Sequence, residues 1–117
     1  MPGEPEVIQH AYDLVVWSVP VIAKFPRSHR FVLGERMEGM LYSVLEDLIA
    51  ARYAPSPRKV EVLVRVNLSL EVFRYQTRLA KDLKVMGLGQ YEHANRLVDA
   101  VGRQVGGWLT SLSKGKE

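Results

Sequence analysis

The chain contains no cysteine and no long run of uncharged apolar residues. The first absence excludes disulfide bonds and thiolate chemistry. The second argues against a membrane-spanning helix, which needs about 20 consecutive apolar residues. The opening residues MPGEPE are acidic, whereas a secretory signal begins with basic residues and continues into an apolar segment. We therefore expect a soluble, cytoplasmic protein.

Motifs for catalysis and for metal binding are also missing. The three histidines lack the spacing of a zinc site, and neither an HExxH nor an ExxH pair occurs. Glu46 and Asp47 are adjacent, so on a helix they point in different directions and make a poor acid–base pair. The GLG at 87–89 lacks the strand and the spacing of a phosphate-binding loop. We expect no catalytic residue, no metal and no cofactor, and an enzyme is the least favoured class.

The composition that remains is typical of a globular protein, with 47% apolar and 25% charged residues in 117. This length suits one domain, which we expect to cover residues 1–117. Apolar residues recur at three- and four-residue spacing, most clearly at Met37, Met40, Leu41 and Val44, which indicates amphipathic helices. The predicted helices cover about 5–24, 31–54, 57–86 and 90–113. Their short connections predict an all-α fold, an antiparallel up-down four-helix bundle.

Proline and glycine mark the expected helix ends. Pro20 should kink the first helix or end it early, because it removes a backbone hydrogen bond. The valine-rich segment Leu14–Val19 could also be a buried strand, but no partner strand with a period of two residues appears elsewhere. Ser56 and Pro57 suit the N-cap and first position of the third helix. Gly87 can adopt the left-handed conformation that ends it.

Residues 25–36, FPRSHRFVLGER, form the only long irregular break predicted between helices. Pro26 should end the first helix nearby, because it fixes its own φ and pushes Phe25 toward an extended conformation. Phe25 and Phe31 flank the turn and can anchor it in the core, and Gly34 opens the next helix. We interpret this stretch as an apolar-anchored connection with a solvated basic rim. The rim consists of Lys24, Arg27, Arg30 and Arg36.

Positive charge is distributed unevenly along the chain. The net charges are −3 for residues 1–23, +3 for 24–36, −2 for 37–54 and +4 for 58–84. Arg74, Arg78 and Lys81 fall on one stripe of the third helix, and Lys84 extends its positive end. Such a stripe can bind the phosphates of a nucleic acid. It could equally pair with acidic faces of neighbouring helices or subunits.

The last helix contains three glycines, which cost helical stability and therefore need a reason. They suggest either a close backbone approach or room for Trp108. We expect Trp108 to be buried on the apolar face of this helix, with Gly106 and Gly107 letting a neighbouring element approach. The first helix and the first half of the third carry more apolar surface than one bundle core can use. This surplus indicates an interface between copies of the chain.

Three blocks of sequence resemble a known family over nearly the whole chain. They are Trp17 with FPRSHRFVLGER, NLSLEVFRYQTRLAKDL at 67–83, and GQYEHANRLVDAVGRQVGGWL at 89–109. The chain resembles the accessory variability determinant (Avd) of diversity-generating retroelements. Avd belongs to a wider four-helix-bundle family that includes proteins encoded in intervening sequences of 23S ribosomal RNA. The matching motif residues are Trp17, Phe25, Pro26, Arg27, Phe31, Gly34, Gly102, Arg103, Gly106, Gly107 and Trp108.

The resemblance implies a function that the residues alone do not give. It implies a homopentameric barrel without catalysis of its own, which binds the retroelement reverse transcriptase and nucleic acid, RNA or DNA, during mutagenic retrohoming. The candidate binding residues are then Arg74, Arg78, Lys81 and Lys84. The alternatives are a bundle of the ribosomal intervening-sequence type without a reverse transcriptase partner, and a structural oligomer whose basic stripe pairs with its neighbours.

Overall fold

The structure, a computed structural model, describes residues 4–115 and is all-helical over that range. The long helices are α1 (Glu4–Ala23), α3 (Glu35–Tyr53), α4 (Ser56–Asp82) and α5 (Leu88–Ser113). A short α2 (Arg27–His29) and a π-helix, η1 (Arg30–Gly34), join α1 to α3. The predicted all-α fold is confirmed, and the segment that could have been a strand is part of α1.

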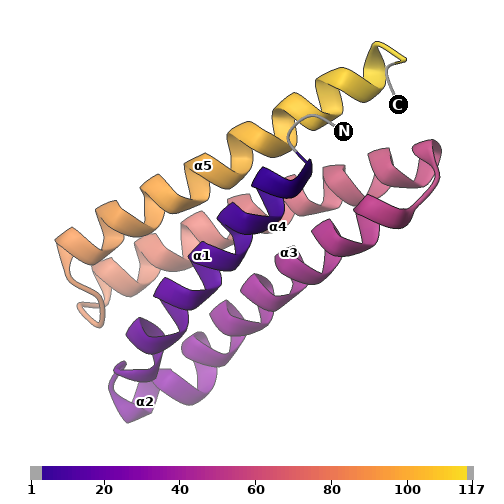
Figure 1. Ribbon diagram of the computed structural model, residues 1–117. Coiled ribbons are helices and arrows are strands. Elements are labelled where there is room, and N and C mark those ends of the chain that lie inside the picture. Colours follow the sequence, from indigo (N-terminus) through magenta and orange to yellow (C-terminus); the bar gives the residue numbers. More distant parts are fainter. Residues whose placement is uncertain (1–3, 116–117) are drawn as a thin grey trace.

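The four long helices lie side by side and antiparallel, in a body of 47 × 22 × 19 Å (Figure 1). Each packs on two neighbours, in the cyclic order α1, α3, α4, α5. The core follows the helical period, as in the buried α3 residues Met37, Leu41, Val44, Leu48 and Ala51. This period sets which face of each helix turns inward, so the predicted amphipathic pattern accounts for the core.

The first helix was predicted to end at about residue 24, and α1 continues past Pro20 to Ala23, so Pro20 does not end it early. The predicted N-cap of α4 is wrong by one residue. Ser56 is the first residue of α4 and not its N-cap, since Pro55 holds that position with no side-chain cap. Pro57 is therefore the second helical residue. A proline is tolerated in a first turn because the backbone N–H groups there have no partner within the helix.

The connection after α1 is more helical than predicted. The break is confined to the residues around Pro26, whose carbonyl accepts hydrogen bonds from the N–H groups of His29 and Arg30. Phe25 is buried as expected, but Phe31 is 53% exposed, so the prediction that both rings anchor the turn is wrong for Phe31. A π-turn takes one more residue than an α-turn, which changes the direction of the side chains that follow. Phe31 lies within this π-helix and is exposed, while Gly34 stays buried.

Gly34 is buried in a tight contact between α1 and the start of α3. A Cβ atom at this position would lie 3.0 Å from Cγ2 of Ile22 and 3.7 Å from a ring carbon of Phe25. The glycine therefore lets the start of α3 approach the end of α1 closely. Gly34 is also the N-cap of α3, which agrees with the prediction that it opens the next helix.

α4 ends at Asp82. The left-handed residue that follows the helix is Lys84, whereas the sequence predicted Gly87. Lys84 has φ of 64°, whereas Gly87 has φ of −77° and precedes α5. The N–H of Lys84 donates to the carbonyl of Lys81, and the N–H of Val85 donates to that of Ala80. This pair of bonds is the Schellman motif, whose left-handed position is usually glycine. A side chain there costs roughly 1–2 kcal/mol.

We expect Lys84→Gly to raise the free energy of unfolding by about 1 kcal/mol, because glycine adopts this conformation without strain. Chemical denaturation of the two proteins measures the difference. Lys84→Ala is the matched control: it removes the same charge but keeps the Cβ atom, so it should give no such gain. Equal stabilisation by alanine would show that charge, and not backbone strain, is the cause.

Candidate nucleic-acid interface

Three of the four predicted cations lie together on the side of α4 that faces α5. Arg74 and Arg78 line a shallow depression between the two helices. Lys81 borders it, with Nζ 4.7 Å from the centre of the Tyr91 ring. Lys84 lies beyond them, in the turn between α4 and α5. The stripe predicted from helical spacing is thus present, toward the end of the bundle that holds the turn between α4 and α5 (Figure 1).

Arg74 links two helices through two ion pairs, and its side chain is 32% exposed. Its guanidinium donates to Oε1 of Glu71 at 3.1 Å and to Oδ1 of Asp99, on α5, at 3.0 Å. Gly102 leaves the room that this requires, since a Cβ atom there would lie 3.3 Å from Nη2 of Arg74. The glycine of the GR motif therefore accommodates an arginine of a neighbouring helix. Arg74 has a structural role in this fold.

Arg78 and Lys84 are exposed, and the side chain of Lys81 is 31% exposed. Arg78 is well exposed and reaches Asp82 only at 3.9 Å, at the limit of an ion pair. Lys81 lies 3.4 Å from the same carboxylate. Within the described part of the chain, Lys84 has no acidic partner. An exposed pair of this kind contributes little free energy, so an incoming phosphate can displace it.

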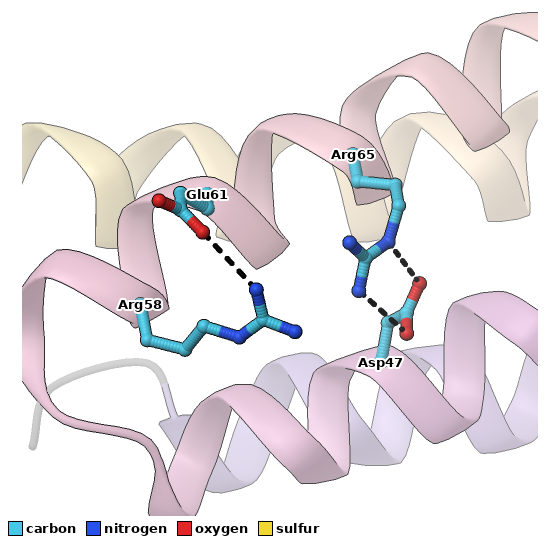
Figure 2. Close-up of polar contacts among 4 residues, drawn as sticks. All are labelled: Asp47, Arg58, Glu61 and Arg65. Carbon is cyan, nitrogen blue, oxygen red and sulfur yellow. Dashed lines mark hydrogen bonds and ion pairs between the residues drawn. The ribbon is translucent and has the colours of Figure 1, made fainter.

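The first half of α4 contributes little free positive charge, although the sequence is basic there. Arg65 makes a bidentate contact with Asp47 of α3, at 3.2 and 3.3 Å, and this hydrogen-bonded carboxylate raises the pKa of Arg65 (Figure 2). Arg58 pairs with Glu61 at 3.1 Å (Figure 2). The buried Lys59 donates to two carbonyls at the end of α3. Arg65 thus links α4 to α3, Lys59 caps the end of α3, and Arg58 pairs within α4.

Sequence reasoning missed the aromatic and amide groups of the depression. Tyr75, Tyr91 and Asn95 line it beside the two arginines. Its volume of about 150 Å³ is below the 300–1,000 Å³ typical of small-molecule sites, which favours a contact surface over an enclosed ligand site. The acids Glu71 and Asp82 could have been paired with the arginines from local spacing. Asp99 could not, because it belongs to another helix.

A stripe of exposed apolar side chains runs along the outward face of α4. It consists of Val60, Val64, Leu68, Val72, Tyr75, Leu79 and Leu83. From Val64 onward the spacing repeats after eleven residues, which keeps the stripe nearly straight along the helix. Single exposed apolar residues are ordinary, but a continuous stripe marks an interaction surface. We refer to these seven residues as the α4 stripe. Besides the predicted first half, it includes the second half of the helix.

A comparison with protein families decides which class of bundle this is. The model of the bAvd-like family matches residues 7–112. The chain belongs to the bAvd-like family. No curated protein matches it. This membership confirms the resemblance found in the sequence, and it indicates an accessory role in a diversity-generating retroelement, in association with its reverse transcriptase.

The motif residues of this bAvd-like protein have mixed positions. Phe25 and Trp108 are buried, and Trp17 packs on His93 with their ring centres 4.7 Å apart. Pro26, Arg27 and Arg103 are exposed. A Cβ atom at Gly106 or Gly107 would meet nothing within 4 Å, so the expected close approach of another element is wrong within this chain. Among the described helices, none is long and apolar enough to cross a membrane.

Proposed function

We propose that this protein is the non-enzymatic accessory subunit of a diversity-generating retroelement, which binds the reverse transcriptase and the template RNA or cDNA during mutagenic retrohoming. The observation that carries the proposal is the match of the bAvd-like family to residues 7–112. The exposed cations Arg78 and Lys84 and the partly exposed Lys81 support it, because each can contact a phosphate. Arg74 is withdrawn from the binding set, since Glu71 and Asp99 hold it.

Assembly is the second part of the proposal. The α4 stripe supports self-association, and the family resemblance supports a homopentameric ring in which a single-domain protomer repeats five times. One protomer offers only a few phosphate contacts. A ring would repeat them along a long nucleic acid, and repetition raises the overall affinity without any new kind of contact.

Charge reversal at Arg78 tests the binding surface. We expect Arg78→Glu together with Lys84→Glu to weaken binding to RNA at least about tenfold, a loss of about 1.4 kcal/mol. The logarithm of the affinity should fall by about 0.7 to 0.9 per log unit of salt for each phosphate contacted, and the variant should show a smaller slope. Fluorescence anisotropy over a salt series measures both quantities, and capture on immobilised reverse transcriptase tests the second partner.

Arg58→Glu is the matched control, because Arg58 is an exposed arginine of the same helix beside an acid, at the opposite end of the bundle. It should leave binding nearly unchanged. If the double variant stays folded and binds RNA and polymerase as the wild type does, the assignment of this surface is wrong. A gene neighbourhood without a reverse transcriptase would favour the alternative, a bundle of the ribosomal intervening-sequence type.

A further inference from the structure

The connection between α1 and α3 holds positive charge that stays free of acidic partners. Among the residues that the structure describes, no carboxylate lies within ion-pair distance of Lys24, Arg27 or Arg36. Arg30 donates only to the carbonyl of Ala23, at 3.4 Å. On α4, by contrast, most cations have a carboxylate or a carbonyl as partner. We refer to residues 24–36 as the corner.

The corner also presents an aromatic ring to solvent. Phe31 is 53% exposed and its neighbour Val32 is 63% exposed, and both lie in the π-helix η1. The guanidinium carbon of Arg30 lies 4.8 Å from the centre of the Phe31 ring. Exposing a phenylalanine forgoes the stabilisation that its burial would give. An exposed ring beside an arginine, in a segment whose other cations have no acidic partner among the described residues, is a combination suited to single-stranded nucleic acid.

We propose that the corner is a binding site for single-stranded nucleic acid, in which an unpaired base stacks on Phe31 and the surrounding cations contact the flanking phosphates. Every base has a flat face that an aromatic ring can cover, so such a site tolerates any sequence. A duplex cannot use the ring, because its bases are already stacked on each other. Phe31 therefore selects single strands, while Arg27, Arg30 and Arg36 supply affinity.

This inference rests on the proposed nucleic-acid role but assigns a different site from the one on α4. The corner and the turn between α4 and α5 lie at the same end of the bundle (Figure 1). One strand can therefore pass from the corner toward Lys84 without crossing the long face of the protein. The two surfaces have separate tasks: the corner recognises an unpaired base, and the α4 end adds phosphate contacts.

The test compares Phe31→Ala with the wild-type protein in anisotropy titrations against a labelled 20-nucleotide oligo-U strand and a duplex of the same length. Base stacking contributes about 1–3 kcal/mol per base, so the variant should bind the single strand about 5- to 150-fold more weakly. Binding to the duplex should change less than about twofold. Phe31→Leu keeps the apolar bulk without the flat face, so it should fold normally and still lose single-strand affinity.

Tyr53→Ala is the matched control. Tyr53 is an exposed aromatic residue with the guanidinium carbon of Arg52 5.5 Å from its ring centre, at the other end of the bundle. Its removal should leave single-strand binding unchanged. Replacing both Arg27 and Arg36 with glutamine should weaken binding to both ligands and reduce the salt slope by about 1.4 to 1.8.

The outcomes separate this inference from the proposed function. If the wild-type protein binds no nucleic acid even at low salt, the nucleic-acid part of the proposed function and the inference both fail. If it binds, and Phe31→Ala and Phe31→Leu behave like Tyr53→Ala, only the inference is wrong. Equal losses for single strand and duplex would also overturn it. Unchanged nucleic-acid binding with lost capture of the reverse transcriptase would make the corner a protein-docking surface instead.

Discussion

Trp108→Ala is expected to lower the free energy of unfolding by about 3–5 kcal/mol, as removing a large buried aromatic side chain does. Trp108 is only 2% exposed, and it belongs to the continuous core to which α1, α3, α4 and α5 contribute. Alanine would leave a cavity that the surrounding helices cannot fill, because packed cores relax only in part. Thermal and chemical denaturation measure the loss, with helicity by circular dichroism as the check on folding.

Trp108→Phe separates ring volume from polarity at this position. The indole N–H of Trp108 is buried and has no hydrogen-bond partner among the described residues. A buried donor without a partner costs about 1–3 kcal/mol, so removing it offsets part of the smaller ring's lost packing. We expect phenylalanine to cost much less than alanine. An alanine variant as stable as the wild type would instead make the GGW motif a surface feature, available to a partner such as the polymerase.

Leu68→Asp is expected to convert the proposed ring into monomers. Light scattering of the wild-type protein should give about five times the chain mass of 13.3 kDa, and the variant should give one. Leu68 is 65% exposed at the middle of the α4 stripe, so a carboxylate there does not disturb the protomer core. In an interface between two copies, however, the charge would lose its water without gaining a partner, which costs several kcal/mol.

Asn67→Asp is the control for added charge, because the neighbouring Asn67 is exposed and outside the α4 stripe. It should leave the assembly intact. A wild-type protein that is already monomeric at micromolar concentration would rule out the ring. A Leu68→Asp protein of unchanged mass would remove the α4 stripe from the interface and leave the exposed residues of α1, such as Tyr12 and Val16, as the next surface to test.

Counting the charged residues of each segment could not show which basic side chains lack an acidic partner. Judged by sequence, the segment 58–84 is the more basic, because its net charge is +4 and that of residues 24–36 is +3. In the structure, Asp47 of α3 forms an ion pair with Arg65, and Asp99 of α5 forms an ion pair with Arg74. Local pairs such as Arg58 with Glu61 are predictable from their spacing of three residues. Pairs between helices depend on how each helix is rotated, which only packing sets.

The sequence by itself determined the helices, the buried positions and the family. A period of three to four residues places apolar side chains on one face of each helix, and burying those faces together requires no other information. The tertiary structure decided the corner and the site. Phe31 lies in the π-helix η1 and is exposed, while Gly34 of the same π-helix packs close to Ile22 of α1. Arg74 pairs with Asp99 at 3.0 Å because packing places α5 beside α4. Such contacts join residues far apart in the chain, and no local pattern records them.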